Sequence, residues 1–431
     1  MLVNICVVAL GKIGLPLAVQ FAQSGHLVIG ADISAATVDL VNDGIAPFPG
    51  EADLDERLAE VIGDGRLSST TDVTAAVRRS QVVVVVVPLI VDRYKEPDFG
   101  ALDQATAAIG AGLGAGALVI YETTLPVGTT RQRFAPALAA TSGLSLGDGL
   151  SVAFSPERVY SGRIFADLRH YPKLVGGIDD ASTKLAISFY ESVLQFDDRD
   201  DLARRNGVWD LGSSEAAELA KLAETTYRDI NIGFANELAR YADQHGIDIA
   251  HVIDSCNSQP FSHIHQPGVA VGGHCIPVYP HFYLAGDPTA EIVAAARRVN
   301  DAMPAYAVGR LAERLGSLNG LTVAVLGLSY RGGVKESAFS GAFALVDALR
   351  AAGATAVIHD PLYADEELLS ADLTPYHLGE QCDAAIVQAD HAEYRSLQST
   401  DLGGAKLVVD GRRCVAAPTD LDVITLGGGS R

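Results

Sequence analysis

Two hydrophobic periods alternate along the first part of the chain. Short runs of aliphatic residues are separated by longer, Ala-rich stretches in which hydrophobic positions recur every three or four residues. The short runs predict strands at Asn4–Leu10, His26–Ala31, Val82–Val87, Leu118–Tyr121 and Ser151–Phe154. Strands that alternate with helices are typical of a parallel sheet with helices on both faces, so we expect an α/β fold.

The middle of the chain changes to a helical period. Residues Ser213–His245 contain few helix breakers and predict one long helix. A second helix is expected over Thr289–Leu315, with a kink at Pro304. A helix as long as the first one favours a homodimer, because it needs a partner to bury its second apolar side.

The strand–helix pattern restarts at Leu321, with a helix expected over Ala338–Ala352 and a strand over Ala354–His359. This second unit resembles the first. In the first, a strand enters Gly11 and the next strand ends in Asp32; in the second, the corresponding residues are Gly327 and Asp360. We therefore predict two Rossmann-like, doubly wound parallel-sheet domains joined by a central helical domain, with boundaries at 1–205, 206–316 and 317–431. We expect the terminal residues 427–431 to be disordered.

Composition excludes several classes of protein. The 431 residues carry 53 acidic and 32 basic side chains, a formal net charge of −21, which disfavours nucleic acids and anionic membranes as partners. The longest aliphatic run, Val82–Val87, is far shorter than the roughly 20 residues of a membrane span. The amino terminus lacks the features of a signal peptide. Five scattered cysteines without CxxC spacing argue against disulfides and a metal site and favour the reducing cytoplasm.

The sequence A-L-G-K-I-G between the first strand and helix is the strongest local motif. It comprises Ala9, Leu10, Gly11, Lys12, Ile13 and Gly14. In a dinucleotide-binding turn, glycines let backbone N–H groups approach a pyrophosphate at the helix start. Asp32 lies where an acidic residue would bond the ribose 2′-hydroxyl, which favours NAD over NADP. Ala9 stands where such turns usually have glycine, and a turn without ligand is the alternative.

The sequence V-G-G-H-C-I-P places Cys275 in a loop after Gly272 and Gly273. Paired glycines let a loop approach a ligand and present the thiol, whereas the alternative is a small buried cysteine. The neighbouring His274 is a weaker candidate, because adjacent loop residues often point apart.

Lys221, Thr225 and Arg228 share one face of the long helix. Two cations on that face could hold a phosphate or an oxyanion, and a partly buried lysine could act in proton transfer. The alternative is a solvated face paired with Glu218 and Glu224. Two loops that follow predicted strands, 122–130 and 155–159, lie where such folds bind ligands.

In this order, the motifs resemble the UDP-glucose/GDP-mannose dehydrogenase family, from Ile5 to about Arg412. The similarity is strongest in ETTLPVGTT, SPERVYSGR, VGGHCIP and VLGLSYRGG, and in the long-helix stretch that contains TYRDINI. The amino-acid sequence of the stretches TYRDINI and GGHCIP is most similar to the branch of the family that acts on UDP-N-acetylhexosamines. The resemblance implies oxidation of a sugar C6 alcohol to a carboxylate with two NAD+. It further implies an NAD-binding first domain, a central dimerisation and catalytic domain, and a last domain that binds the nucleotide sugar.

Roles for single residues follow from the same resemblance. Cys275 is implied as the thiolate nucleophile, Lys221 as a base or oxyanion partner and Glu157 as the activator of water. NAD would be held by the six residues of the turn and by Asp32, Val87, Pro88, Thr123 and Thr124, the last also as a catalytic contact. The nucleotide sugar would be held by Glu157, Arg158, Lys221, Thr225, Arg228, Asn231, Gly272, Gly273, Tyr330 and Arg331. No metal is implied, because NAD carries the hydride chemistry.

The chain departs from the family pattern at three positions. Thr225, Tyr279 and Ala338 stand where family members usually have Asn, Asp and Arg. The missing carboxylate at Tyr279 leaves a second enzymatic hypothesis open, in which the reaction stops at the aldehyde or returns the hydride in an epimerisation. A degenerate protein that only binds NAD and a nucleotide sugar is a third hypothesis.

Overall fold

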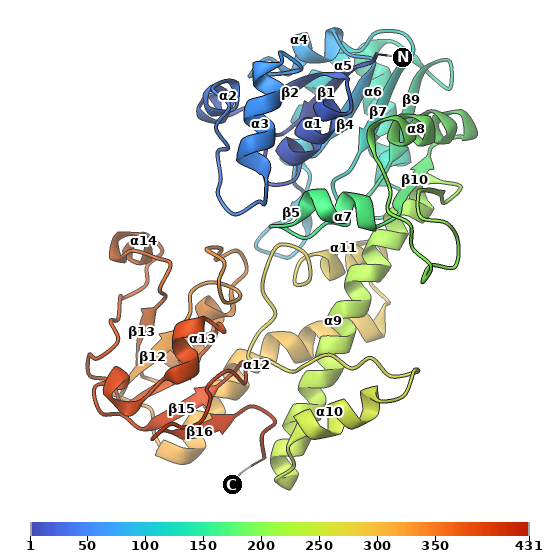
Figure 1. Cartoon of the computed structure of the whole chain (residues 1–431). Coiled ribbons are helices and arrows are strands. Elements are labelled where there is room, and N and C mark those ends of the chain that lie inside the picture. Colours follow the sequence, from blue (N-terminus) through green and yellow to red (C-terminus); the bar gives the residue numbers. More distant parts are fainter. Residues whose placement is uncertain (1, 430–431) are drawn as a thin grey trace. The chain divides into compact units, whose positions relative to one another are not determined.

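The computed structural model describes residues 2–429. The chain divides into two compact units, and most of their strands and helices are labelled in Figure 1. The N-terminal unit comprises Met1–Ala223 and His281–Gly286, and the C-terminal unit comprises Glu224–Pro280 and Asp287–Arg431. The three domain boundaries expected from the sequence stay a prediction, and each unit is described by itself.

The sheet of the N-terminal unit contains all five strands that the sequence predicts in this part of the chain. Its order is β11 (Val208–Asp210), β10 (Lys173–Gly177), β9 (Gly149–Phe154), β7 (Ala117–Tyr121), β4 (Val82–Val85), β1 (Asn4–Val8), β2 (Leu27–Ala31) and β3 (Leu67–Thr70). The short strand β8 (Ser145–Leu146) pairs with β9. Chain order reverses between β1 and β4, and this switch point is where doubly wound sheets bind ligands.

The helices of this unit connect the strands and cover the sheet (Figure 1). They are α1 (Gly14–Gln23), α2 (Ala35–Asn42), α3 (Leu54–Gly63), α4 (Val73–Arg78), α5 (Gly100–Gly112), α6 (Ala135–Ser142), α7 (Ile164–His170) and α8 (Asp180–Val193). A π-helical segment (Thr130–Phe134) precedes α6, and β5 (Ile90–Val91) and β6 (Pro97–Asp98) form a hairpin. The core packs strand side chains such as Ile5 and Ile120 against Phe21 of α1 and Phe189 of α8.

Two strands, β10 and β11, depart from the expected parallel arrangement, because β11 pairs in parallel with β10. β10 runs antiparallel to β9, with Gly176 opposite Phe154 and Gly177 opposite Ala153. The amino end of β10 therefore lies at the same sheet edge as the carboxyl ends of β7 and β9. Its first residue, Lys173, is thereby brought to the edge where parallel strands carry functional side chains.

The helical part includes the long helix predicted from the sequence. α9 spans Ser214–His245 and crosses the division between the units. It is followed by α10 (Ile249–Asn257), α11 (Tyr279–Gly286) and α12 (Glu291–Leu315). Pro304 lies inside α12 without ending it.

The C-terminal unit contains the second sheet, which is parallel throughout. Its order is β13 (Thr355–His359), β12 (Thr322–Leu326), β14 (Ala384–Val387), β15 (Leu407–Asp410) and β16 (Asp422–Thr425). The helices that follow strands of this sheet are α13 (Gly341–Ala351) and α14 (Asp365–Ser370), with short 3-10 segments at Ala392–Ser396 and Ser399–Leu402.

The resemblance between the two strand–helix–strand units extends to single hydrogen bonds. Leu10 N–H donates to Asp32 Oδ2 at 2.8 Å, and Leu328 N–H donates to Asp360 Oδ2 at 2.8 Å. The second carboxylate differs in one respect, because it is buried and also bonded to His391 Nε2 at 3.1 Å. Asp360 is therefore engaged within the protein and does not offer a ribose contact like that expected of Asp32.

The expectation that residues 427–431 are disordered is wrong for Gly427. Its N–H donates to Asp243 Oδ2 at 3.2 Å, and its carbonyl accepts the Ile249 N–H at 2.8 Å. A Cβ on Gly427 would lie 2.8 Å from the Ala239 Cβ, so the absence of a side chain permits this packing. Residues 430 and 431 lie outside the described part of the chain.

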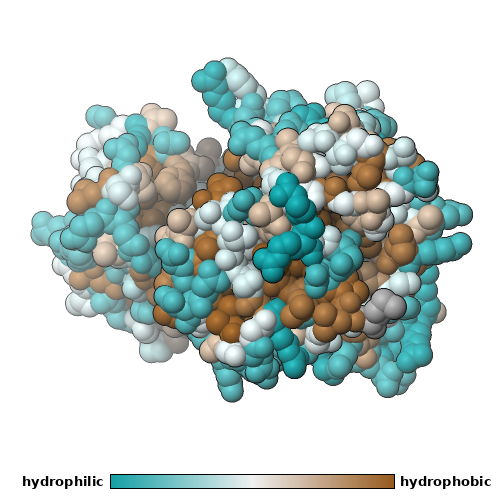
Figure 2. Space-filling view, turned by 90° about the horizontal axis from the view of Figure 1, so that it is seen from above, coloured by the Kyte–Doolittle hydropathy of each residue, from teal (hydrophilic) through white to brown (hydrophobic). Residues whose placement is uncertain are grey.

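The surface carries many hydrophilic side chains (Figure 2). Hydrophilic side chains project from the face shown in Figure 2, and many hydrophobic residues lie in recesses between them. Within residues 2–429, no helix is long and apolar enough to cross a membrane. The same residues include no group of three or more His, Cys, Asp and Glu side chains that could hold a metal ion.

Candidate active site

The predicted dinucleotide turn lies between β1 and α1, at the switch point of the sheet. Ala9 adopts a left-handed conformation with φ of 78°, which glycine would adopt at lower cost. Both Asp32 carboxylate oxygens accept backbone hydrogen bonds at 2.8 Å, one from Leu10 and one from Ser34. These bonds fix the carboxylate at the end of β2, beside the turn, as recognition of a ribose requires.

The two glycines of the turn have different surroundings. A Cβ on Gly11 would meet nothing within 4 Å, so the space beside this residue is open to a ligand. A Cβ on Gly14 would lie 1.9 Å from the Ala9 carbonyl oxygen, so Gly14 is required by close packing of helix and turn. No side chain among the described residues caps α1, and its first N–H groups suit a pyrophosphate. Lys12 is exposed beside Gly11, and Ile13 is half-buried.

Leu10 contributes to this turn in another way than the sequence suggests. Its side chain is fully buried in the core, and its N–H is used by Asp32, so a direct cofactor contact through either group is not supported. Farther along the sheet edge, the Thr123 hydroxyl donates to the Val87 carbonyl at 2.6 Å. This bond joins the loops after β4 and β7, which carry the exposed Pro88 and the buried Thr124.

Four buried side chains meet at the carboxyl ends of β7 and β9. Lys173 Nζ lies 2.9 Å from Glu122 Oε2 and 2.7 Å from Glu157 Oε2. Tyr190 of α8 donates its hydroxyl hydrogen bond to Glu122. Burial raises the pKa of Glu122 to about 7, whereas Lys173 and the Arg158 N–H outweigh burial and lower the pKa of Glu157. Glu157 is thus held as a carboxylate, and neither Glu122 nor Lys173 was among the predicted site residues.

The start of α9 is tied to the loop after β7. Glu218 is fully buried and accepts hydrogen bonds from the Gly128 N–H at 2.5 Å and the Thr130 N–H at 2.8 Å. The suggestion that Glu218 belongs to a solvated face is therefore wrong. Lys221, one turn later, is buried with 8% exposure, so it does not belong to a solvated face either.

The nucleophile candidate lies in the C-terminal unit, where Cys275 is exposed. The two preceding glycines pack against the loop after β12. A Cβ on Gly272 would lie 2.7 Å from the Tyr330 Cβ, and one on Gly273 would lie 3.2 Å from the Tyr330 ring. Gly273 N–H also donates to the Ala338 carbonyl at 3.1 Å. These glycines therefore hold the cysteine loop against the C-terminal sheet domain, and their contact with a substrate stays a proposal.

Polar contacts strengthen this junction of loops. His274 Nε2 lies 3.3 Å from Glu336 Oε2, so the imidazole is directed to the loop after β12. Arg331 Nε donates to the Tyr330 hydroxyl at 3.0 Å. The candidate nucleophile thus lies in a loop that packs against the C-terminal sheet domain.

The predicted substrate residues of α9 in the C-terminal unit differ in exposure. Thr225 is buried and Arg228 is exposed, although helical spacing places both near one face. Asn231 donates to the His263 carbonyl at 2.6 Å and accepts the His265 N–H at 2.9 Å. Both ends of this amide hold the backbone of the loop before Cys275, so Asn231 positions that loop.

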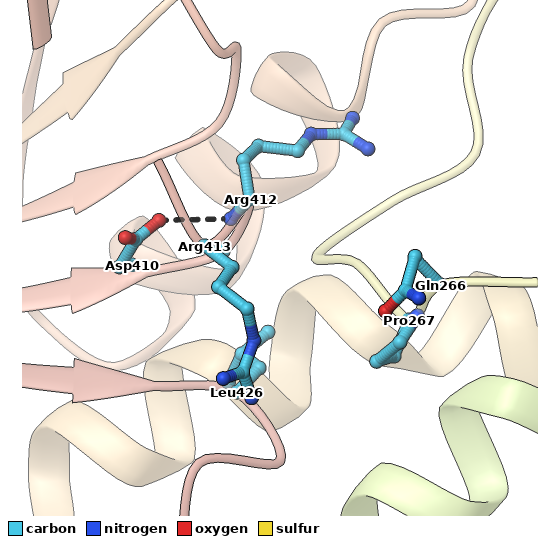
Figure 3. Close-up of a pocket in the computed structure, with 7 residues that line it drawn as sticks. Gln266, Pro267, Asp410, Arg412, Arg413 and Leu426 are labelled. Atoms are coloured by element: carbon cyan, nitrogen blue, oxygen red, sulfur yellow. Dashed lines mark hydrogen bonds between the residues drawn. The ribbon is translucent and has the colours of Figure 1, made fainter. Parts of the chain in front are cut away.

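A cavity of about 230 Å³ opens at the carboxyl ends of β15 and β16. Arg412 and Arg413 extend from the end of β15 in different directions, and Gln266 and Pro267 belong to another segment of the lining (Figure 3). Arg412 donates to the Gln388 carbonyl at 2.6 Å, and Arg413 pairs with Asp248 at 2.8 Å. Sequence reasoning missed both arginines, although the pair directly follows a strand end.

Comparisons with known proteins agree with this geometry along the chain. Three sequence models of the UDP-glucose/GDP-mannose dehydrogenase family match: the NAD binding domain at residues 3–194, the central domain at 215–302 and the UDP binding domain at 324–417. The chain belongs to the UDP-glucose/GDP-mannose dehydrogenase family. It is an NAD-dependent nucleotide-sugar dehydrogenase, as the motifs implied.

Individual relatives cover nearly the whole chain. UDP-N-acetyl-D-mannosamine dehydrogenase of Pyrococcus horikoshii is 35% identical over 96% of both chains. NDP-N-acetyl-D-galactosaminuronic acid dehydrogenase of Ralstonia nicotianae is 31% identical over 95% of both. The solved Pyrococcus horikoshii structure superimposes with a TM-score of 0.86 over 99% of both chains, at 32% identity. A UDP-glucose dehydrogenase of Pyrobaculum islandicum gives 0.87 at 26% identity, over 100% of this chain and 98% of the other. These similarities confirm the predicted fold class.

The anchored Asp32 carboxylate leads to a prediction about the cofactor. We expect kcat/KM for NAD to exceed that for NADP by about 100-fold or more, because the carboxylate would repel a 2′-phosphate. Initial rates with the two cofactors measure this ratio. Asp32→Asn, which removes the charge and keeps an acceptor oxygen, should narrow it. Equal efficiencies in the unaltered dehydrogenase would contradict the role of Asp32.

Proposed function

We propose that this dehydrogenase oxidises the C6 hydroxyl of a UDP-N-acetylhexosamine to the uronic acid, through an aldehyde and a thioester on Cys275. The observation that carries the proposal is the exposed Cys275 on a glycine loop packed against the loop after β12. The sugar class is supported by relatives named for UDP-N-acetyl-D-mannosamine. A solvent-exposed thiol nucleophile must stay reduced, so we also propose the cytoplasm as its compartment.

In the first oxidation, Lys221 accepts the proton of the C6 hydroxyl or stabilises the resulting oxyanion. Its burial supports this role, since a buried ammonium can be held close to the reacting oxygen away from bulk water. NAD, when bound, accepts the hydride of each oxidation. The turn at Gly11, the uncapped start of α1 and Asp32 would hold it, with Thr123 and Thr124 at the neighbouring strand end.

The second oxidation requires a covalent intermediate. The Cys275 thiolate adds to the aldehyde carbon to form a thiohemiacetal, and loss of a second hydride leaves a thioester. Glu157 then takes a proton from the water that attacks the thioester carbonyl. The lowered pKa of Glu157, which Lys173 maintains against burial, keeps it ionised and able to accept that proton at neutral pH.

We assign the nucleotide portion of the substrate to the C-terminal unit. Arg412 and Arg413 give the cavity after β15 two guanidinium groups, which suit phosphate oxygens. Tyr330 and Arg331 lie in the loop that packs against the cysteine loop. Exposed Arg228 is a further cation for the substrate.

A two-electron reaction is the second candidate, and one observation favours it. Tyr279 N–H donates to the Cys275 carbonyl at 2.9 Å, so the residue that replaces the family's usual aspartate lies one turn from the nucleophile. If that carboxylate is needed, the reaction stops early. A screen of UDP- and GDP-sugars, with NADH counted per sugar and the product mass measured, tests both candidates. Two NADH per sugar and an acid product support the four-electron reaction. One NADH per sugar, or none, supports the alternative. Binding of the ligands without any turnover supports a degenerate protein.

We also propose a homodimer formed through α9. Tyr227, Phe234 and Tyr241 recur every seven residues on one face and are 56%, 51% and 61% exposed. Such an exposed aromatic stripe suits a second copy of the helix. We expect light scattering to give a dimer mass at micromolar concentration and Phe234→Glu to give a monomer. Phe261→Ser, at another exposed aromatic residue of the same unit, should leave the dimer intact. A monomeric unaltered protein would refute the proposal.

A further inference from the structure

Glu122, Lys173, Glu157 and Tyr190 form one buried polar cluster in the N-terminal unit. The Lys173 ammonium bridges the two carboxylates, and the Tyr190 hydroxyl donates to Glu122. The side chains of Glu122 and Lys173 are 0% and 4% exposed, whereas that of Glu157 is 10% exposed. Glu157 is thus the member with the greatest access to a ligand, and Glu122 lies deeper.

The charges of this cluster favour the uptake of one proton. Two carboxylates and one ammonium leave one uncompensated negative charge, which is costly in a buried place. Tyr190 remains a donor, because burial raises the pKa of its hydroxyl. The nearby Arg158 guanidinium donates to the Pro172 carbonyl at 3.3 Å.

The fold determines the relative positions of these three side chains. Glu122 directly follows β7 and Glu157 lies in the loop after β9, while Lys173 begins the antiparallel β10. Ser155, directly after β9, holds the loop that carries Glu157 against β10, because its hydroxyl donates to the Leu174 carbonyl at 2.8 Å. The distance between the ammonium and both carboxylates is therefore set by the sheet and not by flexible loops alone.

We propose that Glu122 stores the proton that Glu157 removes from water during thioester hydrolysis, with Lys173 as the residue that positions both carboxylates. This inference rests on the proposed function. In the step, the water oxygen bonds to the thioester carbonyl carbon, the carbon–sulfur bond breaks, and sulfur leaves as the Cys275 thiolate. One water proton goes to Glu157 and passes to the ionised Glu122, which shares the Lys173 ammonium with Glu157, and Glu122 releases it before the next turnover.

The different surroundings of the two carboxyl groups support this direction of transfer. Burial raises the pKa of Glu122 to about 7, whereas Lys173 keeps the pKa of Glu157 below its usual range. A proton that reaches Glu157 therefore moves to the group that holds it more tightly. Glu157 returns to its ionised form and can accept a proton again.

The test is Glu122→Gln, followed through both half-reactions. The amide retains an oxygen acceptor but cannot take up a proton. We expect the first NADH to form within about twofold of the normal rate and thioester hydrolysis to slow about tenfold or more. Intact-protein mass spectrometry should then show the acyl group on Cys275. The rise of the hydrolysis rate with pH near 7 should disappear, since no group remains to ionise there.

Tyr121→Phe is the matched control. Tyr121 ends β7 directly before Glu122, and its buried hydroxyl bonds Thr106 Oγ1 at 2.8 Å. The control should hydrolyse the thioester at the normal rate with the normal pH profile. An equal slowing in both variants would reduce Glu122 to a structural role and overturn the inference, as would normal hydrolysis by Glu122→Gln.

A second variant provides the test if Glu122→Gln misfolds. Tyr190→Phe removes the hydrogen bond that stabilises the ionised Glu122, so the pH midpoint of hydrolysis should move upward. An unchanged midpoint would overturn the inference. If the unaltered protein forms no NADH with any nucleotide sugar, the proposed function itself fails, which is a distinguishable result.

Discussion

Cys275→Ser is expected to abolish uronic acid formation while NAD and the nucleotide sugar still bind. A hydroxyl is a far weaker nucleophile than a thiolate at neutral pH, and removal of a covalent nucleophile costs about 1000-fold or more in rate. Cys275 is exposed, so the oxygen should cause little change in packing. In the proposed route the second oxidation acts on the thiohemiacetal of Cys275, and the block should therefore fall after the aldehyde.

The measurement is acid formed per sugar, by mass analysis, together with binding titrations of both ligands. Cys256→Ser serves as the control, because this partly buried free cysteine lies on α10 of the same unit. It should retain full activity. If Cys275→Ser still produced two NADH and the acid at a normal rate, a thioester on this residue would be excluded.

Gly14→Ala is expected to lower the free energy of unfolding by about 3 kcal/mol and to remove measurable NAD binding. The added Cβ would lie 1.9 Å from the Ala9 carbonyl oxygen, which is backbone and cannot rotate away. The turn must therefore shift, and it carries the N–H groups that would face the pyrophosphate. This clash outweighs the roughly 1 kcal/mol that alanine gains over glycine inside a helix.

Gly11→Ala separates cofactor binding from stability. Its Cβ would enter open space, so the free energy of unfolding should change by less than about 1 kcal/mol, while NAD affinity falls about tenfold because the methyl lies beside the pyrophosphate. Urea unfolding and NAD titration of both variants provide the comparison. A normal unfolding free energy and normal NAD affinity in Gly14→Ala would contradict the close packing of this turn.

Elements governed by local pattern were predictable from the sequence. The strands that enter Gly11 and Gly327, the long α9 and the end of β2 at Asp32 all appear where hydrophobic periodicity places them. One misassigned role concerns a buried contact. Glu218 is of a residue type common at surfaces, yet it binds the backbone at Gly128 and Thr130, about 90 positions earlier in the chain. The paired glycines before Cys275 indicated ligand approach, which stays a prediction, and the structure adds their packing against Tyr330.

The sequence by itself therefore determined the α/β class, the dinucleotide turn, the family and the candidate nucleophile, because each depends on spacing within a short segment. Only the tertiary structure identified Lys173 as the partner of Glu122 and Glu157, which it contacts across separations of 51 and 16 positions. That contact depends on β10 running antiparallel to β9. Strand direction is decided by the packing of the whole sheet and leaves little trace in local hydrophobic periodicity, since a strand has the same two-residue period in either direction.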